Sequence, residues 1–312
     1  MQYLGEIISL VVAILWTATA LFANEASRRI GAMSTNLFRM VLSSILLAGL
    51  LWIAIGHPYP AFADGKTWLW MGLSALVGYV FGDFCLFNSY VVIGARFGQL
   101  FMTLAPVFAA FAGWILLGET LSWKSVLAMG VTLSGIALSI LSRSQDGHHL
   151  TLRLPLKGIL LGIGAGMGQG VGLVLSKIGM QHYEAALPAT APAAFDWAMP
   201  FASTMIRSLT GAVGFFVWRA LLRQLPQLRA AVHDRRGMQF TGLTTLFGPF
   251  IGVSLSLMAV QYARAGIAST LMALTPVLII LPYSMIYKQK ITPKEILGVT
   301  VSMTGVALFF LL

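Results

Sequence analysis

The sequence predicts an all-α integral membrane protein with ten transmembrane helices, formed by two inverted five-helix repeats. Three observations point to this fold class. Of the 312 residues, 58% are hydrophobic and 10% are charged, and apolar windows of helical length recur along the whole chain. An ordinary soluble domain carries about 25% charged residues, whereas a helix that crosses the hydrocarbon needs about 20 mostly apolar ones.

Ten such windows follow one another with short connections, which leave no soluble domain of useful size. They cover residues 6–23, 34–56, 67–92, 96–117, 123–142, 156–178, 198–219, 239–262, 266–287 and 292–312. The first window does not have the features of a cleaved signal peptide, since residues 1–5 carry no positive charge and Arg28 and Arg29 follow the apolar run. We therefore expect it to remain in the mature protein.

The positive charges predict an orientation. Of the 20 lysines and arginines, fourteen lie in or beside odd-numbered connections and four in or beside even-numbered ones, while Arg39 and Arg207 lie within windows. Short loops rich in lysine and arginine are retained in the cytoplasm. We therefore expect a multi-pass protein of the inner membrane with both termini outside the cytoplasm. The net charge of +10 then reflects topology and attraction to the lipid bilayer, and we expect no nucleic-acid partner.

An internal repeat relates the two halves of the chain. A shift of 170 residues lays 102–138 on 272–308 without a gap, and ten of the 37 pairs are identical, including Pro106 with Pro276. A shift of 168 pairs Arg39 with Arg207. We therefore predict one five-span repeat over residues 1–142 and a second over 155–312, joined by a basic connecting loop at 143–154.

Five spans are an odd number, so the second repeat must enter the membrane upside down relative to the first. Inverted repeats of this kind recur in secondary transporters, where the substrate site lies at the repeat interface near the midplane. Rocking one bundle against the other then gives alternating access. The pattern therefore predicts a carrier for a small molecule, and we expect it to act as a monomer.

Residues 82–122, GDFCLFNSYVVIGARFGQLFMTLAPVFAAFAGWILLGETLS, resemble the third to fifth spans of a repeat in the EamA-type permeases of the drug/metabolite transporter superfamily. The resemblance is carried by the small residues before Pro106, the Pro-Val step that follows and the Leu-Gly-Glu at 117–119. Arg39 and Lys177 also fit the pattern. The resemblance covers both halves of the chain, although the second half has Lys288-Gln289-Lys290 where the first has Gly118-Glu119-Thr120.

The resemblance implies a ten-span permease that moves small metabolites, often exporting amino acids or related compounds. It also implies a central cavity lined mainly by the first, third, fourth, sixth, eighth and ninth spans. Some members of the family have both termini in the cytoplasm, which conflicts with the charge count, and here we follow the charge count.

Three charged residues lie well inside the windows, away from the ends, where charge is expensive and tends to face a cavity or a partner. Arg39 could extend to the head groups, whereas Arg207 lies near the middle of its window and is expected to be buried against carbonyls or a carboxylate. Asp83 is the only carboxylate far from a window end. It could bind and release a proton near neutral pH and couple transport to a proton gradient, or it could form a structural ion pair with an arginine. A shift of 166 aligns residues 81–83 with 247–249, which leaves this charge in one half only.

Polar and aromatic residues near the centres of the windows are candidates to line the cavity. Packing between helices is the alternative role for each of them. Prolines within windows free a backbone carbonyl one turn earlier, which a substrate or water can use. The predicted cavity and substrate-binding residues are Trp16, Tyr79, Asp83, Gln99, Thr103, Gln169, Ser269 and Thr275, and the predicted helix-break or gating residues are Pro106, Pro276, Gly166 and Gly170.

The stretch GIGAGMGQGVG at residues 162–172 has a glycine at every second position. It does not fit Gly-x-Gly-x-x-Gly and lies within an apolar window, so it is not a phosphate-binding loop. Two small-xxx-small series, 162-166-170 and 164-168-172, let other helices approach two faces closely. The sixth span is therefore predicted to be a packing surface or a moving gate.

Other functions are less compatible with these residues. An intramembrane aspartyl protease needs a second buried aspartate, and a serine protease needs a histidine or lysine near a buried serine, whereas no histidine lies in a window. A channel would show rings of charge or repeated carbonyl filters. Because cysteines and histidines do not cluster at metal-ligand spacing, we expect neither a metal ion nor a cofactor.

Overall fold

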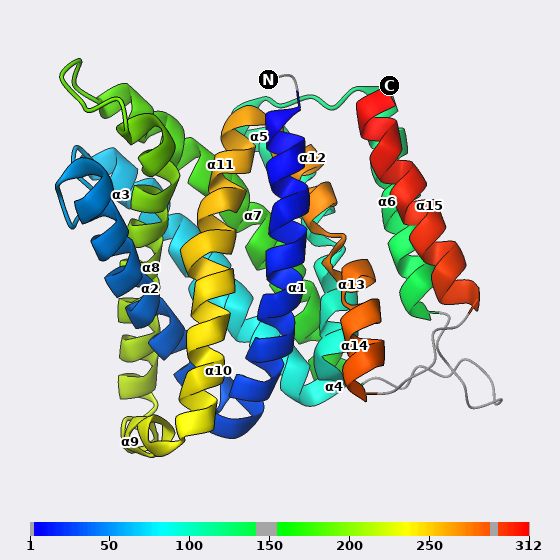
Figure 1. The fold of residues 1–312 in the computed structure, drawn as a ribbon, viewed down its shortest axis with the longest axis horizontal. Coiled ribbons are helices and arrows are strands. Elements are labelled where there is room, and N and C mark those ends of the chain that lie inside the picture. The colour runs from blue at the N-terminus through cyan, green and yellow to red at the C-terminus, as the bar shows by residue number, and fades with distance from the viewer. Residues whose placement is uncertain (1–2, 142–154, 288–292, 312) are drawn as a thin grey trace.

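The structure, a computed structural model, describes residues 3–141, 155–287 and 293–311, and every regular element in these ranges is helical (Figure 1). The first half contains α1 (Leu4–Ile30), α2 (Ala32–Ile55), α3 (Gly65–Ala75), the π-helix η1 (Leu76–Asp83), α4 (Phe84–Met102), α5 (Ala105–Leu117) and α6 (Trp123–Leu141). The second half contains α7 (Leu156–Ala186), α8 (Phe195–Leu221), α9 (Pro226–His233), α10 (Arg235–Thr245), the π-helix η2 (Leu246–Val253), α11 (Ser254–Tyr262), α12 (Ala265–Met272), α13 (Thr275–Leu278), α14 (Ile280–Tyr287) and α15 (Pro293–Leu311).

Each of the ten predicted windows is mostly helical over its described residues, with short breaks at 103–104, 273–274 and 279. Among the residues searched, six helical segments are long and apolar enough to cross a membrane: Leu4–Ile30, Ala32–Ile55, Gly65–Gly94, Leu156–Ala186, Arg235–Tyr262 and Ala265–Pro282. Three shorter apolar helices cover Ala105–Leu117, Trp123–Leu138 and Ile296–Leu308. The predicted all-α class is therefore confirmed for the described residues, and several of the helices are suited to cross a membrane. The predicted connecting loop at 143–154 lies outside the described residues, as do Lys288, Gln289 and Lys290.

The 170-residue shift that relates 102–138 to 272–308 also holds further toward the N-terminus of each repeat. Asp64 caps α3 by accepting a hydrogen bond from the backbone N–H of Thr67, and Asp234 caps α10 in the same way from Gly237. Side-chain acceptors at this position satisfy N–H groups that the first turn leaves free. Asp64 and Asp234 are 170 residues apart, as are the starts of η1 and η2.

The alignment of Asp83 with Pro249 at a shift of 166 is therefore wrong. Both π-helices are eight residues long, and equal positions in them pair Asp83 with Val253 and Gly82 with Gly252. π-Helical turns are rare and occur often at functional sites. In η2 the cause is local, because Gly248 leaves the helical region of φ and ψ and Pro249 lacks an N–H.

Helices α6 and α15 lie side by side at one edge of the bundle and contact each other closely through two glycines, Gly135 and Gly305 (Figure 1). A Cβ atom on Gly135 would collide with the backbone of Ser302, and one on Gly305 with the backbone of Thr132. Moving three residues forward along α6 thus means moving three residues back along α15, so the two helices are antiparallel. Thr132 and Gly135 are themselves related to Ser302 and Gly305 by the repeat.

Helix α7 uses its glycines on two faces. Gly168 and Gly172 pack against Gly82 and Gly78 of η1, where a Cβ atom on Gly168 would lie 2.6 Å from the Cα of Gly82. Gly166 and Gly170 form the other series, which packs against residues 101–109. In Figure 1, α7 rises toward the end of the bundle that carries both termini, whereas α1 descends from it. The glycines therefore let α7 contact both η1 and the start of α5 closely.

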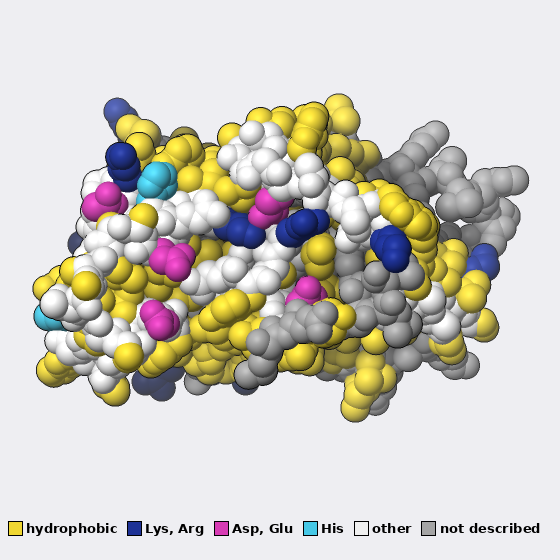
Figure 2. Space-filling view, turned by 90° about the horizontal axis from the view of Figure 1, so that it is seen from above, with side chains coloured by type: hydrophobic (Ala, Val, Ile, Leu, Met, Phe, Trp, Pro, Cys, Tyr) yellow, Lys and Arg dark blue, Asp and Glu magenta, His cyan; other side chains and the backbone are white. Residues whose placement is uncertain are grey.

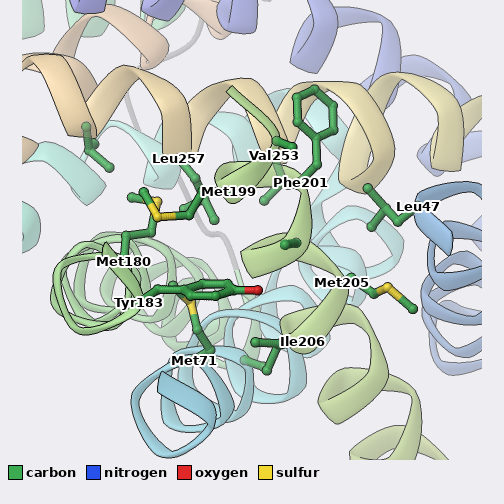
Figure 3. Packing of buried hydrophobic residues seen from close by; sticks show 14 of the residues in the cluster. Leu47, Met71, Met180, Tyr183, Met199, Phe201, Met205, Ile206, Val253 and Leu257 are labelled. Carbon is green, nitrogen blue, oxygen red and sulfur yellow. The ribbon is translucent and has the colours of Figure 1, made fainter. Parts of the chain in front are cut away.

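The largest apolar core lies beside the cavities described below. Figure 3 shows side chains from α3, α7, α8 and α11 meeting around Tyr183, which is fully buried. Its hydroxyl donates to the carbonyl of Ala61 at 2.5 Å. Val253 belongs both to this core and to the cavity wall, so the core fixes one side of the site.

Candidate functional site

Two overlapping cavities lie between the two repeats, and together with the space open to solvent at their mouths they measure about 570 and 550 Å³. Their walls come mainly from α1, η1, α4, α7, η2, α12 and α13, with Ala105 of α5, Ser256 of α11, Arg39 of α2 and Arg207 of α8. The elements that the resemblance implied therefore all contribute. Two arginines from the second and seventh predicted spans add positive charge.

Most of the predicted cavity residues lie on these walls. Trp16, Tyr79, Gln99, Gln169 and Thr275 line both cavities, Asp83 lines one, and Ser269 lines the other. Thr103 is not among the lining residues of either cavity. Phe87 and Tyr90, which follow Asp83 along the same helical face, also line its cavity.

Asp83 is held in a buried ion pair. Its Oδ2 pairs with Nη2 of Arg39, and the two side chains are only 6% and 5% exposed. Its Oδ1 accepts a hydrogen bond from Nε2 of Gln169 at 2.6 Å. Arg39 also lies over the ring of Phe87, with its guanidinium carbon 4.7 Å from the ring centroid. Arg39 therefore does not extend to the head groups, and the first repeat supplies its own pair of opposite charges.

Arg207 is placed differently from Arg39. It is 3% exposed, and its guanidinium carbon lies 4.4 Å from the centroid of the Tyr79 ring. Among the described residues it has no carboxylate within ion-pair distance, and its Nε has no hydrogen-bond partner. The attraction to the aromatic face offsets only part of the cost of burying this cation.

Both predicted proline breaks lie where one helix ends and the next begins. Helix α4 ends at Met102 and α5 begins at Ala105, and likewise α12 ends at Met272 and α13 begins at Thr275. Pro276 cannot donate to the carbonyl of Met272, which accepts a hydrogen bond from the hydroxyl of Thr275 at 3.0 Å instead. Pro276 and Thr275 both line a cavity, so this break forms part of its wall.

A second charged cluster holds the helix ends together at the end of the bundle that carries the termini. Oε1 of Glu119 accepts from Nζ of Lys177 at 2.6 Å, and its Oε2 accepts from the N–H of Ala265 at 3.0 Å. Lys177 also donates to the carbonyl of Ala263 at 2.9 Å, and Arg264 donates to the carbonyl of Thr120. Figure 2, which looks onto this end, shows acidic and basic side chains together among hydrophobic ones.

We expect Glu119→Gln to loosen this end of the bundle, because it removes the charge that holds Lys177 and the start of α12. The test uses a Ser269→Cys reporter on the cavity wall with Cys85→Ser, since Cys85 is the one native cysteine. A membrane-impermeant thiol reagent should label the reporter several times faster in Glu119→Gln. The control is Glu184→Gln, which removes an exposed carboxylate on α7 that forms none of the hydrogen bonds described for Glu119. Equal labelling rates in the two variants would contradict the role of Glu119.

Several wall residues are not predicted by the sequence reasoning, notably Gly248, Pro249 and Val253 of η2 and Ser256 and Met272. The 170-residue shift, continued back through residues 76–83, identifies Pro249 and Val253, which it pairs with Tyr79 and Asp83. Ser256 and Met272 carry no comparable signal. The described residues contain no group of three or more histidine, cysteine, aspartate or glutamate side chains placed to hold a metal ion.

The comparisons with known proteins agree with this architecture. The EamA-like transporter family model matches the chain twice, over residues 3–141 and 156–311. A solved structure titled "Crystal structure of protein" is similar in fold, with a TM-score of 0.71 and 16% identity over 100% of this chain and 97% of the other. The search of curated proteins gives no match. Two successive matches that together span most of the sequence show that this multi-pass membrane protein belongs to the EamA-like transporter family.

Proposed function

We propose that the protein is a secondary transporter that exports or exchanges a small metabolite, such as an amino acid or related compound, by alternating access. The observation that carries the proposal is the position of the cavities, which both repeats line and which hold buried charge. In transporters built from inverted repeats, the substrate site lies between the repeats, and rocking of one bundle against the other exposes it to either side.

We infer ten membrane spans in this transporter. They are the six long apolar segments, the three shorter apolar helices and α8, which is 27 residues long. With this count, the opposite directions of α1 and α7 correspond to inverted repeats. The distribution of lysine and arginine favours an inner-membrane location with both termini outside the cytoplasm.

We also propose Asp83 as the residue that couples transport to protons. Its carboxylate lies on the cavity wall, and its bonds to Arg39 and Gln169 join α2, η1 and α7. A proton on the carboxylate would weaken the ion pair and release these elements from one another. A purely structural ion pair is the alternative role, and the two differ in the effect of a proton gradient.

A passive channel or facilitator is the second candidate function, and an intramembrane enzyme is a weaker one. A selective channel uses rings of charge or of carbonyls. The walls of the two cavities carry one carboxylate and two guanidinium groups in an asymmetric arrangement. This arrangement supports a carrier site for one molecule at a time.

Counterflow tests the proposal. Purified protein in proteoliposomes loaded with an unlabelled compound should accumulate the labelled compound transiently above its external concentration, with a saturable rate. The panel comprises amino acids, carboxylic acids, nucleosides, amines and sugars, and empty liposomes of the same lipid are the control. Flux that never saturates and never exceeds equilibrium would favour the channel and overturn the carrier.

A further inference from the structure

The side chain of Arg207 is a buried cation that faces a cavity without an ion-pair partner; the Asp83 carboxylate, which already pairs with Arg39, acts on it only from beyond ion-pair distance. It is 3% exposed and lines the cavity together with Tyr79, Ser269 and Thr275. The described residues offer it neither an ion pair nor a hydrogen bond to Nε. An uncompensated charge inside a membrane protein is expensive, and such residues usually mark a site for a substrate or an ion.

The repeat explains why Arg207 lacks a partner. The 168-residue shift relates Arg207 of α8 to Arg39 of α2, and the two π-helices relate Val253 to Asp83. In the first repeat, Arg39 pairs with Asp83 inside the protein. In the second repeat the equivalent carboxylate is replaced by an apolar side chain, so Arg207 has no carboxylate of its own repeat to pair with.

Tyr79 supplies a second unsatisfied group at the same place. The guanidinium of Arg207 lies over its ring, and its hydroxyl is buried without a hydrogen-bond partner. A buried hydroxyl left unpaired costs free energy that a ligand oxygen can recover. Arg207 and Tyr79 thus present donors and no acceptor charge to the cavity.

We infer that the cavity binds a small metabolite through its carboxylate, which pairs with the Arg207 guanidinium and accepts a hydrogen bond from the Tyr79 hydroxyl. This inference rests on the proposed function and names the substrate class. Arginine binds carboxylates well because its planar fork can donate two parallel hydrogen bonds.

The rest of the wall sets the other requirements on the substrate. Leu173, Met272, Val253 and the indole of Trp16 give an apolar surface, and Ser269 and Thr275 add hydroxyls. Each oxygen of Asp83 already accepts one hydrogen bond, from Arg39 or from Gln169, and the Arg39 guanidinium balances its charge, so it attracts an ammonium group less strongly than an unpaired carboxylate would. The wall therefore requires a carboxylate and an apolar body of the substrate, whereas an amine, as in an amino acid, is not required for binding.

Thermal unfolding of the purified protein in detergent tests the site without requiring transport, because a ligand that binds the folded state raises its unfolding temperature. The probes are 3-phenylpropionate, its uncharged amide 3-phenylpropionamide, the amine 3-phenylpropylamine and phenyl phosphate. We expect 3-phenylpropionate to raise the unfolding temperature of the wild type and the amide and the amine to have little effect. In Arg207→Gln the affinity for 3-phenylpropionate should fall at least about tenfold.

Two further variants keep the test independent of folding defects. Arg207→Lys keeps the charge but loses the planar fork, so it should retain part of the shift caused by 3-phenylpropionate. Arg223→Gln removes an exposed positive charge just beyond α8 and should retain all of it. Without ligand, Arg207→Gln should unfold at a temperature no lower than the wild type, because it removes a buried unpaired cation.

The outcomes separate this inference from the proposed function. Equal shifts from 3-phenylpropionate in the wild type and Arg207→Gln, or no shift in either, would overturn the carboxylate site even if counterflow succeeds. If 3-phenylpropylamine or phenyl phosphate raises the unfolding temperature more than 3-phenylpropionate does, the site prefers an amine or a phosphate to a carboxylate. This result would also overturn the inference. An Arg207-dependent shift together with channel-like flux would support the site and reject the carrier.

Discussion

Asp83→Val is expected to destabilise the protein by about 3–5 kcal/mol, because it leaves the guanidinium of Arg39 buried without its counter-charge. Valine is the residue that the second repeat has at the equivalent position, Val253. The substitution would therefore put two unpaired arginines on the walls of one site. The free energy of unfolding, measured in mixed micelles with increasing SDS, reports the loss.

The double variant Arg39→Met, Asp83→Val is the control for this prediction. Replacing both members of a buried ion pair by apolar residues is often neutral or stabilising, so the double variant should recover most of the stability. A double variant that is less stable than Asp83→Val would show that the ion pair itself is not what the single substitution removes.

The same residue allows proton coupling to be separated from a structural role. In Asp83→Asn, counterflow should persist while accumulation driven by a proton gradient is lost, because asparagine does not take up the proton. The measurement compares wild type and variant in proteoliposomes with and without a pH difference. A variant whose dependence on the pH difference is unchanged would remove Asp83 from the coupling mechanism and leave it the structural role.

Gly170→Leu is expected to abolish transport and to cost at least about 2 kcal/mol, because overpacking at a close backbone contact forces the helices apart. A Cβ atom on Gly170 would lie 2.9 Å from the backbone nitrogen of Ala109 in α5. The adjacent Gly166 approaches the carbonyl of Phe101 to 2.8 Å in the same way. Helix α7 could then no longer contact α5, and the cavity wall at Ala105 would shift.

Gly130→Leu is the matched control, since it places the same side chain on an exposed face of α6 where no atom lies within 4 Å of an added Cβ. It should insert into membranes, unfold and transport like the wild type. Gly170→Ala should fall between the two. Wild-type activity in Gly170→Leu would mean that close packing of α7 on α5 is dispensable for transport.

Much of the fold can be predicted from the sequence, because the length of an apolar window and the cost of a buried charge are local properties. Each window is mostly helical, the three charged residues predicted well inside the windows line the cavities, and the two glycine series of α7 contact two different elements. Helix α9 was not predicted, because its eight residues lie in a connection between two windows and are too few to show a helical pattern of apolar residues.

The features that were not predicted depend on contacts between distant segments. No local pattern in residues 76–83 signals a π-helix, and the mistaken alignment of Asp83 with Pro249 followed from matching Phe-Gly pairs alone. Whether Arg39 extended to the head groups or turned inward depended on Asp83 and Gln169, which come from other helices. The lack of a partner for Arg207 can be recognised only once all the surrounding side chains are placed.

The crossing of α6 and α15 bears on how such a chain could have arisen. Gly135 lies on Ser302 while Gly305 lies on Thr132, and the repeat maps one contact onto the other. A surface related in this way is complementary to itself, as in an isologous homodimer. A half-length ancestor ending in one such helix could therefore have paired with an identical copy inserted in the opposite direction, and gene duplication with fusion would then have fixed the two orientations in a single polypeptide.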